Sequence, residues 1–417
     1  MRSKRAGRCD DPSALPPGEG GTVTEGEKTS SSRRQFLRCA AFAAGGLCAA
    51  GLAAGGVSRL GRATESVAGA IPAAPGPVSP LRMAKAKYWR PLANKRVQCL
   101  LCPKRCEVGD RERGFCGVRE NREGVYYTLV YGSAAAARPD PIEKKPLFHF
   151  LPGSFAFSIA TAGCNMNCRD CQNWDLSQAR PEQVRSQHLL PAEVAKLALE
   201  SRCGTIAYTY NEPTVFYEYV YDTAAEGHKR GVRSVIISSG YINQEPLRAL
   251  LPRLDAVKVD LKGFTEEFYR RYCSGSLKPV LETIKTVHGS GKWLELVVLI
   301  VPGLNDSETA VRSMCKWIRQ TVGADVPLHF SRFYPNYQLR NLPPTPYATL
   351  RRCQDIAKGL GLHFVYLGNV PEAPSQNTVC PGCGKTLVER RGYTVTAMAL
   401  RKGSCSGCGR RIPGVWD

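Results

Sequence analysis

The pattern of apolar and polar residues changes at about residue 154, where short β-rich runs begin to alternate with helical patterns. Runs rich in Val, Ile, Leu and aromatic residues are expected to form strands. They cover residues 155–161, 205–210, 233–238, 256–261, 294–301, 328–333 and 363–367. Residues 297–301 are apolar without a break, which is typical of a strand buried on both faces. The runs therefore predict a parallel sheet covered by helices.

The segments between these runs have a helical period, and we expect helices over residues 191–200, 280–287 and 307–323. Pro191 suits a first helical turn, where its missing N–H costs nothing. Repeated strand–helix units form either a barrel or a doubly wound sheet. Because no Gly-x-Gly-x-x-Gly opens a helix after the first strand, dinucleotide binding is disfavoured. We predict an α/β fold, a partial (β/α)6 barrel of the TIM type, with the seventh run closing or edging the sheet.

Composition and charge bear on whether the protein crosses a membrane or binds nucleic acid. The chain of 417 residues is 43% hydrophobic, as expected for a globular protein, and no run in its main body is long and apolar enough to predict a transmembrane span. Its formal net charge of +21 suggests an anionic partner at first sight. The basic residues are scattered, however, and metal-bound cysteines would add negative charge. We therefore expect no nucleic-acid partner.

The leader, residues 1–70, is predicted to be disordered and to carry an export signal, and residues 71–94 to form a linker. Two adjacent arginines, Arg33 and Arg34, precede Phe-Leu and a mild Ala/Gly-rich stretch, which resembles a twin-arginine signal. A chance Arg-Arg pair is the alternative. The protein is thus expected to be exported if the leader functions, and to be cytoplasmic otherwise.

Eighteen cysteines are the most informative part of the composition, and eleven of them fall in three tight groups. Disulfides explain these groups poorly, because two cysteines separated by two residues usually share a metal. One group, Cys164, Cys168 and Cys171, follows the first predicted strand with spacing x3 then x2. Three thiolates bind three irons of a 4Fe-4S cubane and leave the fourth iron open. An open iron can chelate S-adenosylmethionine (SAM) through its amino and carboxylate groups, so that reduction yields a 5′-deoxyadenosyl radical. A three-thiolate zinc site and a chance pattern are the alternatives.

With these motifs in order, the chain resembles the radical SAM superfamily, and more narrowly the AmmeMemoRadiSam system radical SAM enzymes, relatives of the pyruvate formate-lyase activating enzymes. The resemblance covers about residues 95–417. It rests on the segments CLLCPKRC (99–106), GFCGVR (114–119), CQNW (171–174) and TYNEPT (209–214), and on two C-terminal Cys-x-x-Cys-Gly motifs. It implies a radical SAM barrel over 151–370, a Cys-rich metal segment over 95–150 and a four-cysteine segment, zinc-ribbon or rubredoxin-like, over 371–417.

The resemblance also implies which residues contact the cofactor. A cationic, zwitterionic molecule needs carboxylates for its amine and donors for its carboxylate. The implied SAM contacts are Tyr210, Asn211, Glu212, Pro213, Ser239, Asp260 and Lys262. One position departs from the family, because Asp170 stands where an aromatic residue usually precedes the third cysteine. Adenine would then stack elsewhere, on Phe333 or Tyr210, or its amine would bind the acidic group.

Two further groups of four cysteines flank the barrel. Cys380, Cys383, Cys405 and Cys408 form paired Cys-x-x-Cys motifs, a strong signal for a four-thiolate metal site, with zinc favoured over iron. Between the motifs we expect two short strands. The N-terminal group, Cys99, Cys102, Cys106 and Cys116, fits either zinc or an auxiliary iron–sulfur cluster, with a slight preference for a structural metal. His149 either serves that site or is a satisfied buried histidine.

The sequence thus predicts a radical SAM enzyme whose cofactors are a 4Fe-4S cluster, SAM and zinc. Its substrate is a protein residue, as in glycyl-radical activation, or a small molecule. Its electron donor is expected to be a flavodoxin- or ferredoxin-like protein. A multi-centre electron-transfer protein without SAM chemistry and a zinc-ribbon interaction module on a degenerate barrel are the alternatives.

Overall fold

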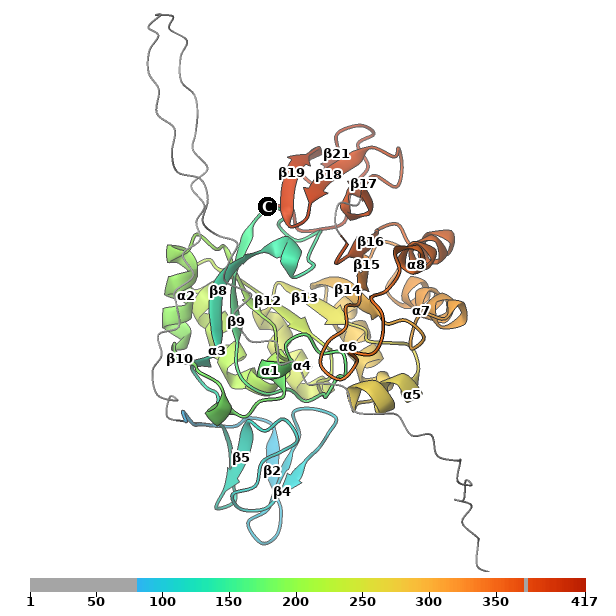
Figure 1. Cartoon of the computed structure of the whole chain (residues 1–417). Helices are drawn as coiled ribbons and strands as arrows, with labels where there is room; N and C mark the ends of the chain where they lie inside the picture. Colours follow the sequence, from blue (N-terminus) through green and yellow to red (C-terminus); the bar gives the residue numbers. More distant parts are fainter. Residues whose placement is uncertain (1–80, 371–373) are drawn as a thin grey trace, which may run out of the picture. The chain divides into compact units, whose positions relative to one another are not determined.

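A computed structural model of the chain describes residues 81–370 and 374–417 (Figure 1). Its central element is an eight-stranded sheet with the order β16-β15-β14-β13-β12-β11-β9-β8. The strands from β9 to β16 are parallel, and β8 lies antiparallel to β9 at one edge. The bounds are β8 Ala136–Pro141, β9 Phe155–Ala160, β11 Thr205–Tyr208, β12 Arg233–Ser238, β13 Ala256–Asp260, β14 Trp293–Ile300, β15 Leu328–Arg332 and β16 Val365–Gly368.

Each of the seven predicted runs overlaps one of these parallel strands, so the prediction of a parallel α/β sheet is confirmed. The seventh run forms β16, which pairs with β15 alone and therefore edges the sheet, one of the two positions predicted for it. Strand β8 was not predicted. Its sequence, AARPDP, contains two prolines, and proline is tolerated only where a ladder hydrogen bond is missing, as at a sheet edge.

Helices follow the strands in sequence. They are α1 Trp174–Ser177, α2 Pro191–Glu200, α3 Tyr217–His228, α4 Gln244–Leu250, α5 Glu266–Phe268, α6 Leu277–Gly289, α7 Glu308–Thr321 and α8 Tyr347–Gly359. The helix at 191–200 has the predicted bounds, and the Ser307 hydroxyl caps α7 by accepting a hydrogen bond from the Ala310 N–H at 3.3 Å. Within the described residues, no helix combines the length and apolarity needed to cross a membrane.

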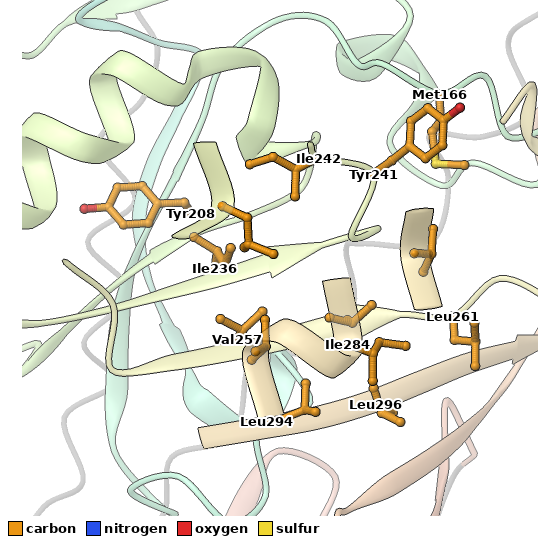
Figure 2. Close-up of a cluster of buried hydrophobic side chains, with 14 of the residues drawn as sticks. Met166, Tyr208, Ile236, Tyr241, Ile242, Val257, Leu261, Ile284, Leu294 and Leu296 are labelled. Atoms are coloured by element: carbon orange, nitrogen blue, oxygen red, sulfur yellow. The ribbon is translucent and has the colours of Figure 1, made fainter. Parts of the chain in front are cut away.

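A buried apolar cluster lies between the sheet and its helices (Figure 2). Side chains of β12 to β14, such as Val257 and Leu296, gather there with Ile284 of α6. At one end of the cluster, Met166 lies beside the ring of Tyr241. Met166 belongs to the predicted three-cysteine loop, so burial of its side chain, stabilising by about 2 kcal/mol, anchors that loop to the core.

The segment before the sheet contains two small antiparallel sheets, with the orders β1-β6-β5 and β2-β3-β4. Their strands are β1 Ala84–Lys85, β2 Trp89–Pro91, β3 Val97–Cys99, β4 Glu107–Val108, β5 Arg119–Arg122 and β6 Val125–Thr128. Strands β1 and β2 lie in the predicted linker, residues 71–94, whose described part is therefore structured. The twin-arginine motif, Arg33 and Arg34, lies outside the described residues.

Buried polar contacts attach this N-terminal segment to the barrel. The Arg119 guanidinium donates to the Glu218 carboxylate of α3, and both side chains are buried. The Asn243 amide donates to the Leu100 carbonyl at 2.6 Å. Because a buried charge is stable only when it is paired, the Arg119–Glu218 contact makes the position of the segment specific.

The C-terminal segment forms a three-stranded sheet, β17-β18-β19, and a two-stranded sheet, β20-β21. The bounds are β17 Thr378–Val379, β18 Thr386–Arg391, β19 Thr394–Met398, β20 Leu400–Arg401 and β21 Ser404–Cys405. Strands β18 and β19 are the two strands predicted between the Cys-x-x-Cys motifs. The segment packs on the barrel through Phe148 and Tyr366, which share a cluster with Leu387 and Ile412.

Two buried side chains connect the C-terminal segment to the barrel. Arg390 of β18 donates to the Phe148 carbonyl at 2.7 Å and to the Thr378 hydroxyl at 2.9 Å, and its guanidinium stacks 4.2 Å above the Phe148 ring. His149 contacts the Pro413 carbonyl at 2.7 Å and the Tyr366 hydroxyl at 2.6 Å. His149 is therefore a satisfied buried histidine of this interface.

We predict that Arg390→Ala lowers the free energy of unfolding by about 2–4 kcal/mol, because it leaves buried acceptors unsatisfied. Arg391→Ala, which removes the exposed neighbour in the same strand, is the matched control and should cost under about 0.5 kcal/mol. Urea unfolding of both variants under anaerobic conditions measures the difference. Equal midpoints would contradict the buried contacts of Arg390.

Candidate active site

A cavity of about 600 Å³ lies at the carboxyl ends of the parallel strands. The sulfur-bearing residues Cys164, Cys168 and Cys171 line it, together with side chains that follow successive strands. The cavity therefore sits where βα folds place their active sites, on the loops after the strands. Its volume is within the range of pockets that enclose small molecules.

The loop that carries the three cysteines is held by the Asn211 side chain. Its Oδ1 accepts from the Thr161 N–H at 3.2 Å, and its Nδ2 donates to the Gly163 carbonyl at 2.8 Å and to the Ala162 carbonyl at 3.3 Å. Further along the loop, the Asn165 amide donates to the Tyr241 carbonyl at 2.7 Å. Asn211 thus lines the cavity, but its amide atoms are used to fix the turn before Cys164.

Polar hydrogens are directed at the sulfur atoms. The Met166 N–H donates to the Cys164 sulfur at 3.4 Å, and the Ser177 hydroxyl lies 3.2 Å from the Cys171 sulfur. Burial raises the pKa of Cys164 well above its ordinary value. Buried thiols of this kind become thiolates when a metal replaces their protons, so the three residues fit an iron–sulfur cluster.

Glu212 supplies a buried negative charge at the cavity wall. Its Oε1 accepts from the Ser238 hydroxyl at 2.7 Å, and its Oε2 accepts from the Ser239 N–H at 2.7 Å and the Ser239 hydroxyl at 2.6 Å. Gly240 follows with a φ of +71°, and an added Cβ would lie 3.1 Å from Val259. Ser239 therefore acts by holding Glu212, and the carboxylate so fixed suits a cationic ligand.

Three charged side chains at the end of β13, Lys258, Asp260 and Lys262, continue the cavity wall. Lys258 and Lys262 both donate to the Asp260 carboxylate, Lys262 to Oδ2 at 3.2 Å. Although burial acts to raise it, the two lysines hold the pKa of Asp260 below its usual range. Asp170, only 8% exposed, lines the same cavity. Burial raises the pKa of Asp170, and the charge of Lys262 opposes that rise.

Two residues that were predicted to contact SAM, Pro213 and Phe333, do not line the cavity. Pro213 lies outside the cavity lining and starts a 3-10 turn, Pro213–Phe216, capped by the Glu212 side chain, which accepts from the Thr214 N–H. Phe333 is fully buried beside Val301 and Leu339, so it is not placed to stack on a ligand in the cavity. The aromatic residue that does line the cavity is Tyr210.

The sequence did not indicate a second polar network around Tyr210. Its hydroxyl donates to Asp140 and accepts from the Arg138 guanidinium at 3.0 Å. Lys145, 2% exposed, donates to Asp140 Oδ2 at 2.7 Å and lies 4.7 Å above the Tyr210 ring. Lys145 also lines the cavity, and burial lowers its pKa to about 8 against the opposing effect of Asp140. Arg138, Asp140 and Lys145 belong to β8 and the turn after it, which the sequence pattern did not predict.

The C-terminal cysteines form a compact group. Cys380 and Cys408 sulfurs lie 3.6 Å apart, as do those of Cys383 and Cys405. Four thiolates at about 2.3 Å from one ion are separated by about 3.8 Å, so the geometry fits a single tetrahedral metal. Within the described residues this is the one set of three or more such ligands whose atoms all lie within 4.8 Å.

A family model, the radical SAM superfamily, matches residues 158–314, from within β9 to within α7. The chain belongs to this superfamily and is an enzyme of the radical SAM type, a class that implies a 4Fe-4S cluster and SAM. It is 42% identical over 332 residues to an uncharacterized protein of Methanocaldococcus jannaschii (MJ0808), covering 79% of this chain and 99% of that one.

Relatives with named activities are more distant. The chain is 22% identical to the benzylsuccinate synthase activating enzyme of Thauera aromatica, over 46% of this chain and 65% of that one. It is 21% identical to the pyruvate formate-lyase-activating enzyme of Clostridium pasteurianum, over 43% of this chain and 80% of that one. The predicted relation to the activating enzymes is thereby confirmed.

We predict that carbamylation of Lys145 by cyanate has a midpoint near pH 8 in the folded chain and near 10.4 in the denatured chain, because the neutral amine reacts. Asp140→Asn removes the charge that favours the ammonium form and should move the folded midpoint lower. Peptide mass spectrometry across pH 6–11 measures it, with the denatured chain as control. Identical midpoints in the two states would contradict the buried environment of Lys145.

Proposed function

We propose that this chain cleaves SAM reductively at a 4Fe-4S cluster bound by Cys164, Cys168 and Cys171, and that the resulting radical abstracts hydrogen from a substrate in the same cavity. One observation carries the proposal. The three thiols share a single cavity with the fixed carboxylate of Glu212 and with the charged pair Asp260 and Lys262. An electron-transfer protein has no use for a ligand cavity of about 600 Å³ beside its cluster.

The cavity lining offers groups that are complementary in charge to the amino and carboxylate groups of SAM. The carboxylate of Glu212 binds the amino group, while Lys262 and Asp260 serve the cofactor carboxylate and the ribose hydroxyls. Asp170, in place of the usual ring, accepts a hydrogen bond from the adenine amine. Tyr210 lines the cavity with its phenol held by Asp140 and Arg138, so its ring is fixed for contact with the cofactor.

When bound, the cluster supplies one electron that splits SAM into methionine and a 5′-deoxyadenosyl radical. The residues of this chain determine what lies next to that radical. Val297 and Leu299 give an apolar wall that excludes water. Lys145 and Tyr393 line the part of the cavity formed by the turn after β8 and by the C-terminal segment, where the substrate would enter.

The substrate and the electron donor are proposed by class. Two relatives are named for activating other enzymes, so a residue of a partner protein, as in glycyl-radical activation, is one candidate substrate. A small molecule is the other. The electron comes from a flavodoxin- or ferredoxin-like protein, because a one-electron donor of low potential is needed.

For the C-terminal group we propose a zinc ion with a structural role. Sulfur separations of 3.6 Å and the small size of the segment support it, since a metal stabilises a unit too small to build a large core. If metal analysis finds iron instead of zinc at the four C-terminal cysteines, the group is a one-iron redox site.

We predict that Cys168→Ala abolishes formation of 5′-deoxyadenosine and lowers the iron content, because an iron of the cluster loses its ligand. Glu212→Gln should keep the cluster and weaken SAM binding about tenfold or more, because a charged hydrogen bond is lost. Anaerobic reconstitution, dithionite reduction and product analysis measure the first, and calorimetric titration the second.

The matched control for these variants is Cys203→Ala, which replaces an isolated buried cysteine and should leave the product yield unchanged. If reconstituted parent protein with a spectroscopically verified cluster makes no 5′-deoxyadenosine from SAM, the proposed reaction is wrong.

We also propose that the leader directs export by a twin-arginine pathway, which carries folded, cofactor-loaded proteins. Replacement of Arg33 and Arg34 by lysine is expected to shift tagged protein from the extracytoplasmic to the cytoplasmic fraction. Cell fractionation with a twin-arginine cargo as marker measures this. An unchanged distribution would contradict export through the twin-arginine motif.

A further inference from the structure

The N-terminal cysteines meet around one small cavity. Cys99, Cys102, Cys106 and Cys116 all line it, and its volume is about 20 Å³. The four side chains therefore border one common space. Four thiolates bound to a single zinc ion would each stand about 2.3 Å from it, with their sulfurs about 3.8 Å apart.

The positions of the sulfur atoms do not fit a single ion. Across residues 81–370 and 374–417, the C-terminal cysteines are the one group in which three such ligands lie within 4.8 Å of one another, so no three of the N-terminal sulfurs meet that limit. In a polynuclear cluster each thiolate binds a different iron, and the sulfurs are separated by the width of the cluster. The sulfurs of Cys164, Cys168 and Cys171 likewise do not all lie within 4.8 Å of one another.

A backbone amide is directed at one of the four sulfurs. The Phe115 N–H donates to the Cys106 sulfur at 3.3 Å. Donors of this kind stabilise thiolates in metal sites and fix their orientation. The loop conformation at Cys106 is thus arranged for an anionic ligand.

Arg119 adds an independent observation. Its side chain is 1% exposed and lines the same cavity. One of its nitrogens, Nη2, donates to Glu218 and to the Lys87 carbonyl, but Nε and Nη1 are buried with no hydrogen-bond partner among the described residues. Unsatisfied buried guanidinium donors are costly. An anionic cluster in the cavity would accept them through its sulfur atoms.

This cavity adjoins the three-cysteine loop of the active site. An added Cβ on Gly163 would lie 2.6 Å from the Cys116 carbonyl, so the two backbones are in direct contact there. Cys116 and Cys164 line a common polar pocket, and Asn165 lines the N-terminal cavity itself. A group held by the N-terminal cysteines therefore lies next to the group held by Cys164.

We propose that Cys99, Cys102, Cys106 and Cys116 bind a second, redox-active iron–sulfur cluster that passes electrons to the first; this electron-relay role rests on the proposed function. The second cluster accepts one electron from a flavodoxin- or ferredoxin-type protein and gives one electron to the cluster at Cys164, Cys168 and Cys171. One electron enters and one leaves at each step, and no proton or chemical group moves.

The test is anaerobic reconstitution of the Cys164→Ala/Cys168→Ala/Cys171→Ala variant, which removes the first cluster alone. We expect it to keep about four irons with acid-labile sulfide, against about eight in the parent chain, and to give the EPR signal of a reduced cluster with dithionite. The Cys102→Ala/Cys116→Ala variant should keep about four irons and give the EPR signal of the first cluster alone. Cys383→Ser is the matched control, and should lose zinc while its iron content stays unchanged.

A second readout uses the unmodified chain, so the test does not depend on the folding of a variant. Two adjacent reduced clusters interact magnetically, and the EPR spectrum of the fully reduced parent should be broadened relative to the sum of the two variants. Zinc or no metal at the N-terminal group, or a parent chain with about four irons, would overturn the proposal. A parent chain that holds both clusters and makes no 5′-deoxyadenosine would overturn the proposed function alone.

Discussion

The arrangement of the active site depends on one side chain, the amide of Asn211. From the end of β11 it reaches across to the turn after β9 and binds the backbone of Thr161, Ala162 and Gly163. Two strands that pair in the sheet are thereby joined again at their carboxyl ends, directly before Cys164. The rest of the loop is then fixed by burial of Met166 beside Tyr241. Two neighbouring residues of the TYNEPT segment thus have different roles: Asn211 fixes the cysteine loop, and Glu212 lines the cavity.

The two flanking segments are attached by the same physical means. Each inserts one arginine into the barrel region, Arg119 from the N-terminal segment and Arg390 from the C-terminal segment, and each guanidinium is buried and donates to an acceptor there. Since an unpaired buried charge is strongly destabilising, displacement of either segment would destabilise the folded chain. The barrel therefore carries both cysteine groups in defined positions, one beside the cluster loop and one beside β16.

The sequence predicted most of the parallel sheet, because strands buried on both faces have uninterrupted apolar runs that little else produces. The family resemblance also implied polar residues at the ends of those strands, Glu212, Asp260 and Lys262, and all three line the cavity. The sequence missed β8, whose prolines are typical of a loop, and with it Asp140 of that strand and Lys145 of the following turn, which lines the cavity and is paired with Asp140. It also assigned Pro213 to the cofactor, although the role of proline there is to start a turn. No local pattern could distinguish zinc from a cluster at Cys99, because that depends on distances set by the tertiary fold.

The turn between β18 and β19 contributes Gly392 and Tyr393 to the cavity, although both belong to the four-cysteine segment. This part of the cavity wall is thus built from the four-cysteine segment rather than from a barrel loop. Under the proposed function, substrate preference can consequently diverge between relatives through changes in one hairpin, with the residues proposed to bind SAM left intact. The proposed zinc ion then also bears on selectivity, because the hairpin keeps its place only while the segment that carries it stays folded.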